Sequence, residues 1–125
     1  GYGLSYTQFK YSNLVFSKDT LQGIASIKVK ADITNIGDKM GEEVVQLYIR
    51  DELSSVATPI QSLKGFNRVL IAPGQTKTVE FEINALMLSL INETGEQVTE
   101  QGTFRIMIGS NSKSLFLKKN LFYKP

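Results

Sequence analysis

Hydrophobic and polar residues alternate strictly through several segments of this chain, and the alternation restricts its fold more than any other feature. From residue 27 to residue 34, isoleucine, valine or alanine at the odd positions alternates with lysine, aspartate or threonine. A period of two predicts a β-strand with one face in the core and the other in water. Three more hydrophobic stripes follow this rule: Val45, Leu47 and Ile49; Val79, Phe81 and Ile83; and Phe104, Ile106 and Ile108. The same alternation predicts solvent-facing positions for Tyr48 and Met107.

Four weaker hydrophobic segments predict further strands at residues 9–16, 64–71, 88–91 and 115–121. Turn-forming sequences rich in Asn, Gly and Pro separate the strands. Only residues 84–88 resemble a helical turn, with Asn84 as the N-cap. About eight short strands at this spacing predict an all-β sandwich or barrel.

Glycines in three segments have predicted structural roles. Gly37 and Gly41 flank a loop between two long strands, which suggests a hairpin with unusual backbone angles. Gly65 lies inside a predicted strand, which suggests a β-bulge or a close backbone approach. Pro73 and Gly74 fit the central positions of a type II turn.

The composition fits one folded domain spanning residues 1–125. Hydrophobic residues make up 42% and charged residues 21% of the 125 residues, enough for one hydrophobic core. The net charge of +2 gives no sign of a nucleic-acid or anionic-membrane partner, and the apolar runs are too short for a membrane span. The absence of His and Cys removes disulfides, thiolate chemistry, the commonest general base and the commonest metal ligand. We therefore expect no cofactor, no metal and no catalytic site.

Paired carboxylates are the strongest enzyme-like feature of the sequence. Asp51 and Glu52 end a strand at a loop, where a glycosidase could place its two carboxylates, but a solvated strand end is the interpretation that we favour. Glu80 and Glu82 share the wet face of a strand and are interpreted as solubilising charges. A packed sandwich is expected to have no interior pocket, so neither pair is expected in a cleft.

Several motifs, taken in order, resemble the C-terminal fibronectin type III-like domain of family-three glycoside hydrolases, the β-glucosidases and β-xylosidases. The resemblance covers nearly the whole chain. Its motifs are residues 1–7 (GYGLSYT), 33–37 (ITNIG), 41–49 (GEEVVQLYI), 63–69 (LKGFNRV), 72–79 (APGQTKTV) and 102–104 (GTF).

The resemblance implies an immunoglobulin-like or fibronectin type III-like β-sandwich of about seven to eight antiparallel strands. It also implies that the catalytic residues lie in domains that precede this one, so that none is carried over to this chain. The chain would be a non-catalytic accessory domain that docks on those catalytic domains. Its parent would hydrolyse terminal non-reducing β-D-glycosidic bonds, retaining anomeric configuration, in the periplasm or outside the cell.

The first residues are expected to form the contact with the upstream domains. The chain starts at Gly1 without an initiator Met, so we interpret it as a fragment of a longer protein, with residues 1–8 as a junction segment. Tyr2, Leu4 and Tyr6 are apolar or aromatic at alternate positions, and interfaces favour aromatic anchors. We therefore expect these three side chains to dock on the preceding domain.

Two other functions remain open at this point. A carbohydrate-binding module would need a row of exposed aromatic side chains, for which Tyr11 and Tyr48 are candidates, although the absence of Trp counts against it. An adhesion-type sandwich unconnected with sugar cleavage is the third alternative, because this architecture has many functions.

Overall fold

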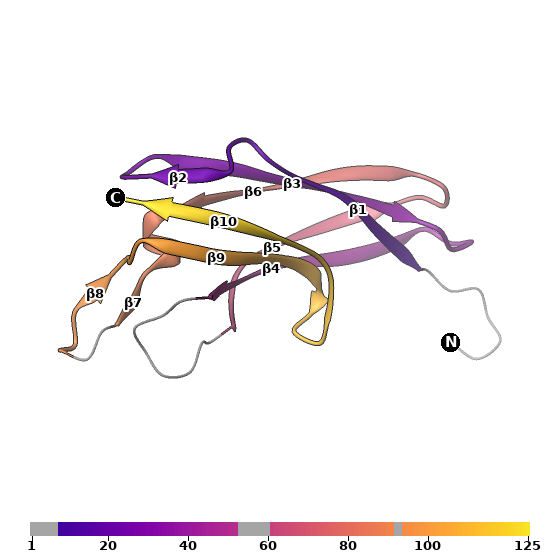
Figure 1. The fold of residues 1–125 in the computed structure, drawn as a ribbon. Helices are drawn as coiled ribbons and strands as arrows, with labels where there is room; N and C mark the ends of the chain where they lie inside the picture. Colours follow the sequence, from indigo (N-terminus) through magenta and orange to yellow (C-terminus); the bar gives the residue numbers. More distant parts are fainter. Residues whose placement is uncertain (1–7, 53–60, 92–93) are drawn as a thin grey trace.

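The computed structural model describes residues 8–52, 61–91 and 94–125, which form an almost wholly β structure. Two sheets pack face to face, which confirms the predicted sandwich (Figure 1). The described residues contain no α-helix. The elements in chain order are β1 (Phe9–Phe16), β2 (Thr20–Gln22), β3 (Ser26–Asn35), β4 (Gly41–Asp51), β5 (Gln61–Ile71), β6 (Thr76–Asn84), the 3-10 helix η1 (Ala85–Leu88), β7 (Leu90–Ile91), β8 (Gln97–Val98), β9 (Gly102–Asn111) and β10 (Ser114–Lys124).

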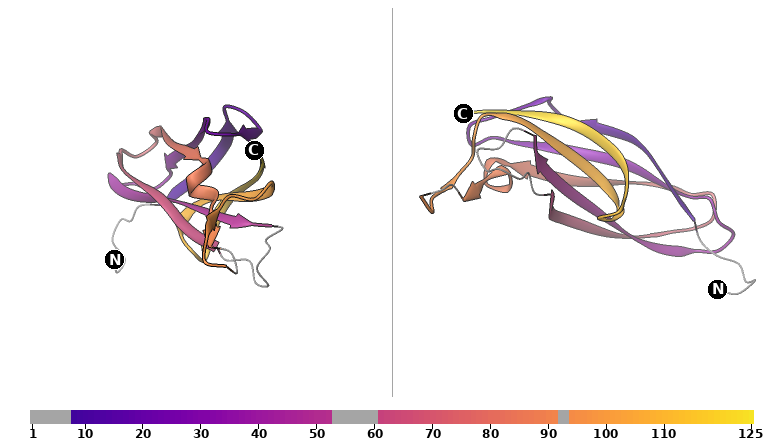
Figure 2. Two further views of the ribbon diagram at one scale, coloured as in Figure 1. Left: turned by 90° about the vertical axis from the view of Figure 1, so that its left-hand side faces the viewer. Right: turned by 60° about the horizontal axis from the view of Figure 1, so that its bottom comes forward.

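One sheet has the strand order β1-β3-β6 and the other the order β2-β10-β9-β4-β5, while β7 and β8 form a separate short hairpin (Figure 2). All of the pairings are antiparallel except that of β2 with β10, which is parallel. The very short strands β2 and β8 were not predicted, because two or three residues are too few to show a period.

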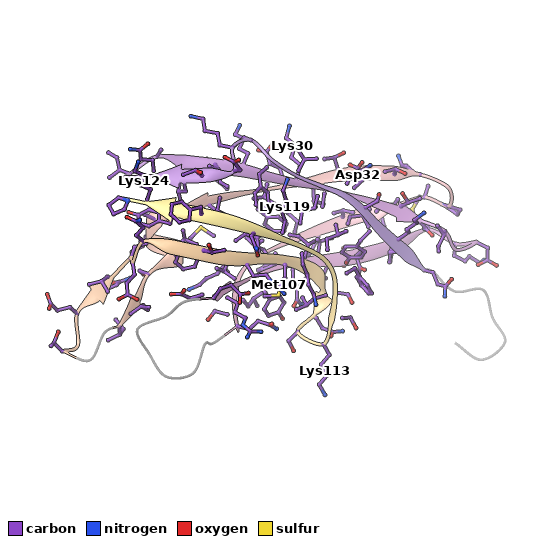
Figure 3. The ribbon with its side chains drawn as sticks, viewed as in Figure 1. Lys30, Asp32, Met107, Lys113, Lys119 and Lys124 are labelled. Atoms are coloured by element: carbon purple, nitrogen blue, oxygen red, sulfur yellow. The ribbon has the colours of Figure 1, made fainter. Side chains whose placement is uncertain are left out.

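The core lies between the two sheets and contains all four predicted stripes. Each stripe residue from β3, β4, β6 and β9 is at most 7% exposed, so the alternation correctly predicted the inward positions. The outward positions of β3 are polar, and Figure 3 shows Lys30 and Asp32 on that outer surface. The core also contains Tyr11, Leu21, Leu121 and Tyr123 from β1, β2 and β10, Ile71 from β5 and Leu88 from η1.

Tyr48 and Met107 differ from the prediction, because both are buried although they lie on the outward side of their strands. They face each other between β4 and β9 and are 8% and 3% exposed. The tip of the β9–β10 hairpin reaches the start of β5, where Gln61 Nε2 donates a hydrogen bond of 3.2 Å to the Ser112 carbonyl oxygen. Because β4 lies between β9 and β5, this contact brings the hairpin tip past β4 to the edge strand.

The bend of that hairpin depends on Gly109. The β9–β10 register shifts on both sides of Leu115, which pairs with Gly109. A Cβ on Gly109 would collide with the Ser114 carbonyl oxygen and would lie 2.8 Å from the Leu115 Cα. Only a residue without a side chain allows the two backbones to come so close.

Asn35 is a fully buried polar residue that joins two loops at one end of the sandwich. Its Nδ2 donates hydrogen bonds of 2.8 Å to the carbonyl oxygens of Lys39 and Ile71, and its Oδ1 accepts one of 2.9 Å from the Gly37 backbone N–H. Gly37 and Gly41 do not have positive φ angles, so the prediction of unusual backbone angles there was wrong. The Asn35 side chain, rather than glycine, shapes this loop.

Three other local predictions are confirmed or corrected. The Pro73-Gly74 turn is confirmed, with φ +77° at Gly74 and a 3.0 Å hydrogen bond from the Gln75 N–H to the Ala72 carbonyl oxygen. The Asn84 N-cap of η1 is also confirmed, since its side chain accepts a hydrogen bond from the Met87 N–H. The strand expected over residues 88–91 was wrong at its start, because η1 continues through residue 88 and β7 begins two residues later.

The predicted irregularity at Gly65 is present in β5. The β4–β5 register shifts between the pairs formed by Leu47 with Gly65 and by Tyr48 with Leu63. This bulge keeps Leu63 on the same outward side of the sheet as Phe66, although the two residues are separated by an odd number of positions.

Candidate functional site

The predicted docking residues Tyr2, Leu4 and Tyr6 lie outside the described residues, so their docking role stays a prediction. The structure places the point where the chain enters the domain. The Gln8 carbonyl oxygen accepts a hydrogen bond of 2.8 Å from the Ile36 N–H, beside the β3–β4 loop. Residue 8 therefore lies at the end of the sandwich that Asn35 organises.

Tyr11 and Tyr48 do not form an exposed aromatic platform. Each is 8% exposed. The Tyr11 hydroxyl donates a hydrogen bond of 2.9 Å to Glu43 Oε2, and burial, together with this carboxylate, raises the pKa of Tyr11 well above its ordinary value. The Tyr48 hydroxyl donates to Gln46 Oε1 at 2.6 Å. Both rings thus have structural roles, and neither Tyr11 nor Tyr48 is exposed enough to stack on a sugar ring.

The two carboxylate pairs have different surroundings from those of a glycosidase site. Glu52 Oε1 lies 3.0 Å from Arg105 Nε. Glu80 lies on the outer face of β6, with its oxygens 3.8 Å from the ammonium groups of Lys28 and Lys30. The Glu80 ion pairs agree with the interpretation of this outward glutamate as a surface charge. Glu52 Oε1 and Asp51 Oδ2 are buried, so the strand end at residues 51 and 52 is only partly solvated.

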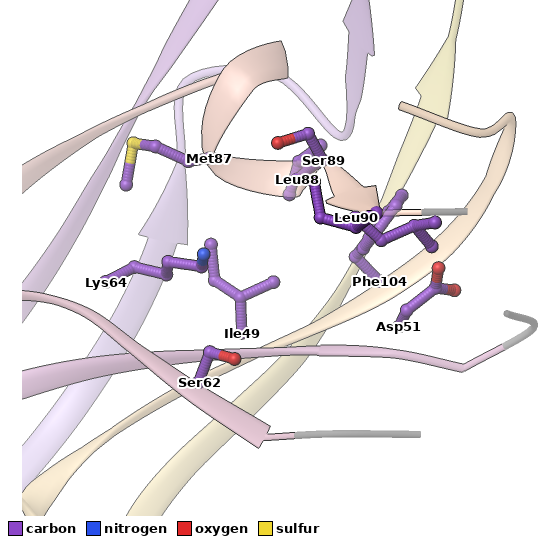
Figure 4. A pocket seen from close by; sticks show the side chains of 10 residues that line it. Ile49, Asp51, Ser62, Lys64, Met87, Leu88, Ser89, Leu90 and Phe104 are labelled. Atoms are coloured by element: carbon purple, nitrogen blue, oxygen red, sulfur yellow. The ribbon is translucent and has the colours of Figure 1, made fainter. Parts of the chain in front are cut away.

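A cavity of about 330 Å³ opens at the end of the sandwich that carries η1 and β7. The expectation that the fold has no pocket was therefore wrong at this end, where η1 and β7 face β4, β5 and β9 across the cavity. The wall is mostly apolar, and Figure 4 shows Asp51 and Lys64 on opposite sides of it. Among the described residues that line the cavity, Asp51 is the one carboxylate, whereas glycosidases that use two protein carboxylates need both of them beside the scissile bond.

The outer face of the three-stranded sheet is polar and internally paired. Asp32 accepts hydrogen bonds from Asn13 Nδ2 at 2.8 Å and from the Thr78 hydroxyl at 2.6 Å, which hold the pKa of its carboxyl below the ordinary value. Thr34 and Thr76 share a hydrogen bond of 2.7 Å. Such a face is suited to contact with water.

The outer face of β5 is different, because its outward positions are mainly apolar and exposed. Phe66, Leu70 and Leu63 are 59%, 53% and 51% exposed. We call these three residues and Arg68, which lies between Phe66 and Leu70, the β5 stripe. Sequence reasoning placed a strand here but did not identify its outward residues as a surface, because the bulge at Gly65 interrupts the alternation.

Among residues 8–52, 61–91 and 94–125, no three acidic side chains gather as ligands for a metal ion. None of the helical turns in this part of the chain has the length and hydrophobicity of a membrane span.

Comparison with known domains identifies the family. The model of the fibronectin type III-like domain matches residues 43–112, from β4 to the β9–β10 turn. The chain belongs to this family. The match confirms the resemblance and agrees with the observed β-sandwich, although the ten strands exceed the expected seven or eight.

The relatives of this fibronectin type III-like domain are much longer enzymes, β-glucosidases and β-xylosidases of glycoside hydrolase family three, and it matches their C-terminal region. A β-xylosidase of Formosa agariphila is 41% identical over 94% of this chain and 16% of its own length. Thermostable β-glucosidase B of Acetivibrio thermocellus is 38% identical over 97% of this chain, again 16% of its own length. The structure of the β-glucosidase EmGH1 from Erythrobacter marinus superposes with a TM-score of 0.86 at 33% identity, covering 96% of this chain and 16% of that one. The chain thus spans about one sixth of the length of these proteins.

Proposed function

We propose that residues 1–125 are a non-catalytic accessory domain of a β-glucosidase-type glycoside hydrolase, which packs on the catalytic part of the enzyme and stabilises it. The parent enzyme hydrolyses terminal non-reducing β-D-glycosidic bonds. Residues 1–8 form the junction with the catalytic domains, and Tyr2, Leu4 and Tyr6 contact those domains.

The observation that carries this proposal is the extent of the match. Relatives named as β-glucosidases or β-xylosidases match over nearly the whole of this chain but over only 16% of their own length. Most of each enzyme is therefore outside the matching region. The chemistry of this chain agrees with an accessory role, because it has no His or Cys and because Glu52 and Glu80 are in ion pairs.

The proposal is tested by comparing this chain alone, the full-length enzyme and an enzyme truncated before residue 1. We expect no hydrolysis of 4-nitrophenyl β-glucoside or β-xyloside by the isolated chain, and lower thermal stability and activity in the truncated enzyme. Turnover by the purified chain that disappears in an Asp51→Asn, Glu52→Gln variant would show that the domain is itself catalytic. A truncated enzyme as stable and active as the full-length one would contradict the stabilising role.

The junction contact is tested by replacing Tyr2, Leu4 and Tyr6 with Ser together. Exposed sites usually change stability by less than about 1 kcal/mol, so the isolated chain should keep its stability while the full-length enzyme loses some. Unfolding of the isolated variant would instead place these residues in the core of the sandwich. Binding of the isolated chain to xylan or β-glucan tighter than about 100 μM would favour the carbohydrate-binding alternative.

A further inference from the structure

We propose that the β5 stripe, centred on Phe66, is the surface by which this domain docks on the catalytic part of a family-three glycoside hydrolase. This inference rests on the proposed accessory function and assigns that function a face of the domain.

The two outer faces of the sandwich differ in chemistry, and the difference singles out β5. Opposite positions on β3 and β6 pair Lys28 with Glu82, Lys30 with Glu80 and Asp32 with Thr78, a pattern of charges and hydroxyls suited to water. On β5 the corresponding outward positions carry phenylalanine and leucine, each more than half exposed. Single exposed apolar side chains are normal, but several together on one strand mark an interaction surface.

The position of β5 in its sheet strengthens this argument. It is an edge strand of 11 residues, next to β4 only, so a long strand edge and an apolar face coincide. Natural proteins protect such edges by covering them, by charging them or by bulges, because an uncovered apolar edge promotes aggregation. The bulge at Gly65 interrupts this edge, and the Asn67 side chain joins β5 to β6 by donating to the Glu80 carbonyl oxygen at 2.9 Å. Neither covers the outward side chains of Phe66 and Leu70.

The stripe has the composition of an interface centre. Phenylalanine and arginine are enriched in protein interfaces, where aromatic side chains fill pockets and arginine forms directed hydrogen bonds. Arg68 lies between Phe66 and Leu70 and already pairs with Glu42 on the neighbouring strand, with 3.4 Å between Nη1 and Oε1. A partner would therefore receive an oriented guanidinium group between two apolar contacts.

The occupant that fits this surface best is the catalytic part of the same polypeptide. In the relatives about five sixths of the chain lies outside this domain. A domain tethered by a short linker meets its neighbour at an effective concentration on the order of millimolar, which favours an intramolecular partner over a second copy of the chain. A surface that docks within one chain can be smaller than a stable dimer interface. The β5 stripe has only four residues, so its small size fits an intramolecular partner.

Hydroxyl-radical footprinting of the full-length enzyme and of the isolated chain tests this assignment directly. Oxidation of a side chain follows its exposure, so Phe66 and Leu70 should be modified several-fold less in the full-length enzyme than in the isolated chain. Val15 on β1 and Ile24 between β2 and β3, which are 54% and 103% exposed and lie away from both the β5 stripe and the β3–β4 loop, should be modified equally in both. Equal modification of Phe66 in the two proteins would overturn the proposal.

The pattern of protection separates failure of this inference from failure of the proposed function. Protection of Val15 or Ile24 but not Phe66 would mean that the domain docks through another face, and the accessory function would survive. If no exposed side chain of the domain were protected, docking itself would be refuted. Concentration-dependent protection of Phe66 in the isolated chain would identify a second copy as the occupant.

A matched pair of variants gives an independent readout. Leu70→Ser and Val15→Ser each remove an aliphatic side chain from an outward strand position. The two side chains are nearly equally exposed but lie in different sheets. Both should leave the urea midpoint of the isolated chain unchanged. In the full-length enzyme Leu70→Ser should lower the midpoint of thermal inactivation and Val15→Ser should not. Equal effects of the two substitutions would contradict a docking role for the β5 stripe.

Discussion

Replacing Asn35 with alanine should destabilise the domain more than the loss of any exposed amide. The substitution removes three hydrogen bonds from a side chain that is completely buried. The Ile71 carbonyl oxygen is buried and would be left without this donor, at a cost of about 2 kcal/mol. The Lys39 carbonyl and the Gly37 N–H are only partly buried, so water can replace the amide there and each should cost about 0.5 kcal/mol. The expected total is about 3 kcal/mol.

Urea denaturation followed by far-ultraviolet circular dichroism measures this loss, since the chain has no Trp for fluorescence. With a slope of about 2 kcal/mol per molar urea, the midpoint should fall by about 1.5 M. Asn67→Ala is the matched control, because it removes one exposed hydrogen bond of 2.9 Å to the Glu80 carbonyl oxygen and should cost less than about 1 kcal/mol. If Asn35→Ala lowers the midpoint no more than the control does, the side chain does not hold the two loops together.

Four further substitutions test two glycines, the buried tyrosine and the hydrogen-bonded aspartate. Gly109→Ala should cost about 3 kcal/mol or more because its Cβ would strike backbone, whereas Gly65→Ala meets only the edge of a ring at 3.4 Å and should cost less than about 1 kcal/mol; urea midpoints compare the two. The raised pKa of Tyr11 means that the folded domain loses stability as pH rises above the unfolded value of about 10, and this part of the alkaline loss should be absent in Tyr11→Phe. The lowered pKa of Asp32 contributes stability above the unfolded value of about 3.9, which is lost as pH falls through the folded pKa. Asn13→Gly, which keeps the positive φ accessible, should move the Asp32 pKa toward its ordinary value in an NMR titration. An unchanged Asp32 titration would show that the amide is not a cause of the shift.

The sequence was sufficient for the inward faces of the strands, because that information is local. Ile27 and Val29 alternate with polar neighbours on the same strand, and this alternation correctly predicted that they are buried. Tyr48 and Met107 were predicted on the correct side but with the wrong exposure, since they lie opposite each other on adjacent strands and the alternation within one strand does not show this pairing. A local sequence pattern also cannot show a contact between residues as far apart as 61 and 112, such as the one between β5 and the β9–β10 hairpin tip.

The candidate site was harder to predict from the sequence, because it too depends on contacts between residues that are far apart in the chain. The aromatic residues chosen as a sugar platform are buried by contacts between elements, such as the hydrogen bond from Tyr11 to Glu43, 32 positions away. The cavity at the η1 end depends on where η1 and β7 lie relative to β4, β5 and β9, and the alternation within single strands does not show this. Asn84 and Pro73-Gly74 were predicted correctly because capping and turn formation involve only the next few residues.

The pattern within β5 nevertheless contained a signal for the proposed docking surface. Val69 and Ile71 face the core, while Phe66 and Leu70 face outward, so this strand is apolar on both sides. Strands covered on both faces have that composition, whereas a strand with one face in water alternates as β3 and β6 do. A strand at the edge of a two-layer sandwich has only one layer of its own domain to cover it. Apolar residues on both of its faces therefore predict a third layer, and in relatives about six times longer than this chain the rest of the polypeptide is available to supply it.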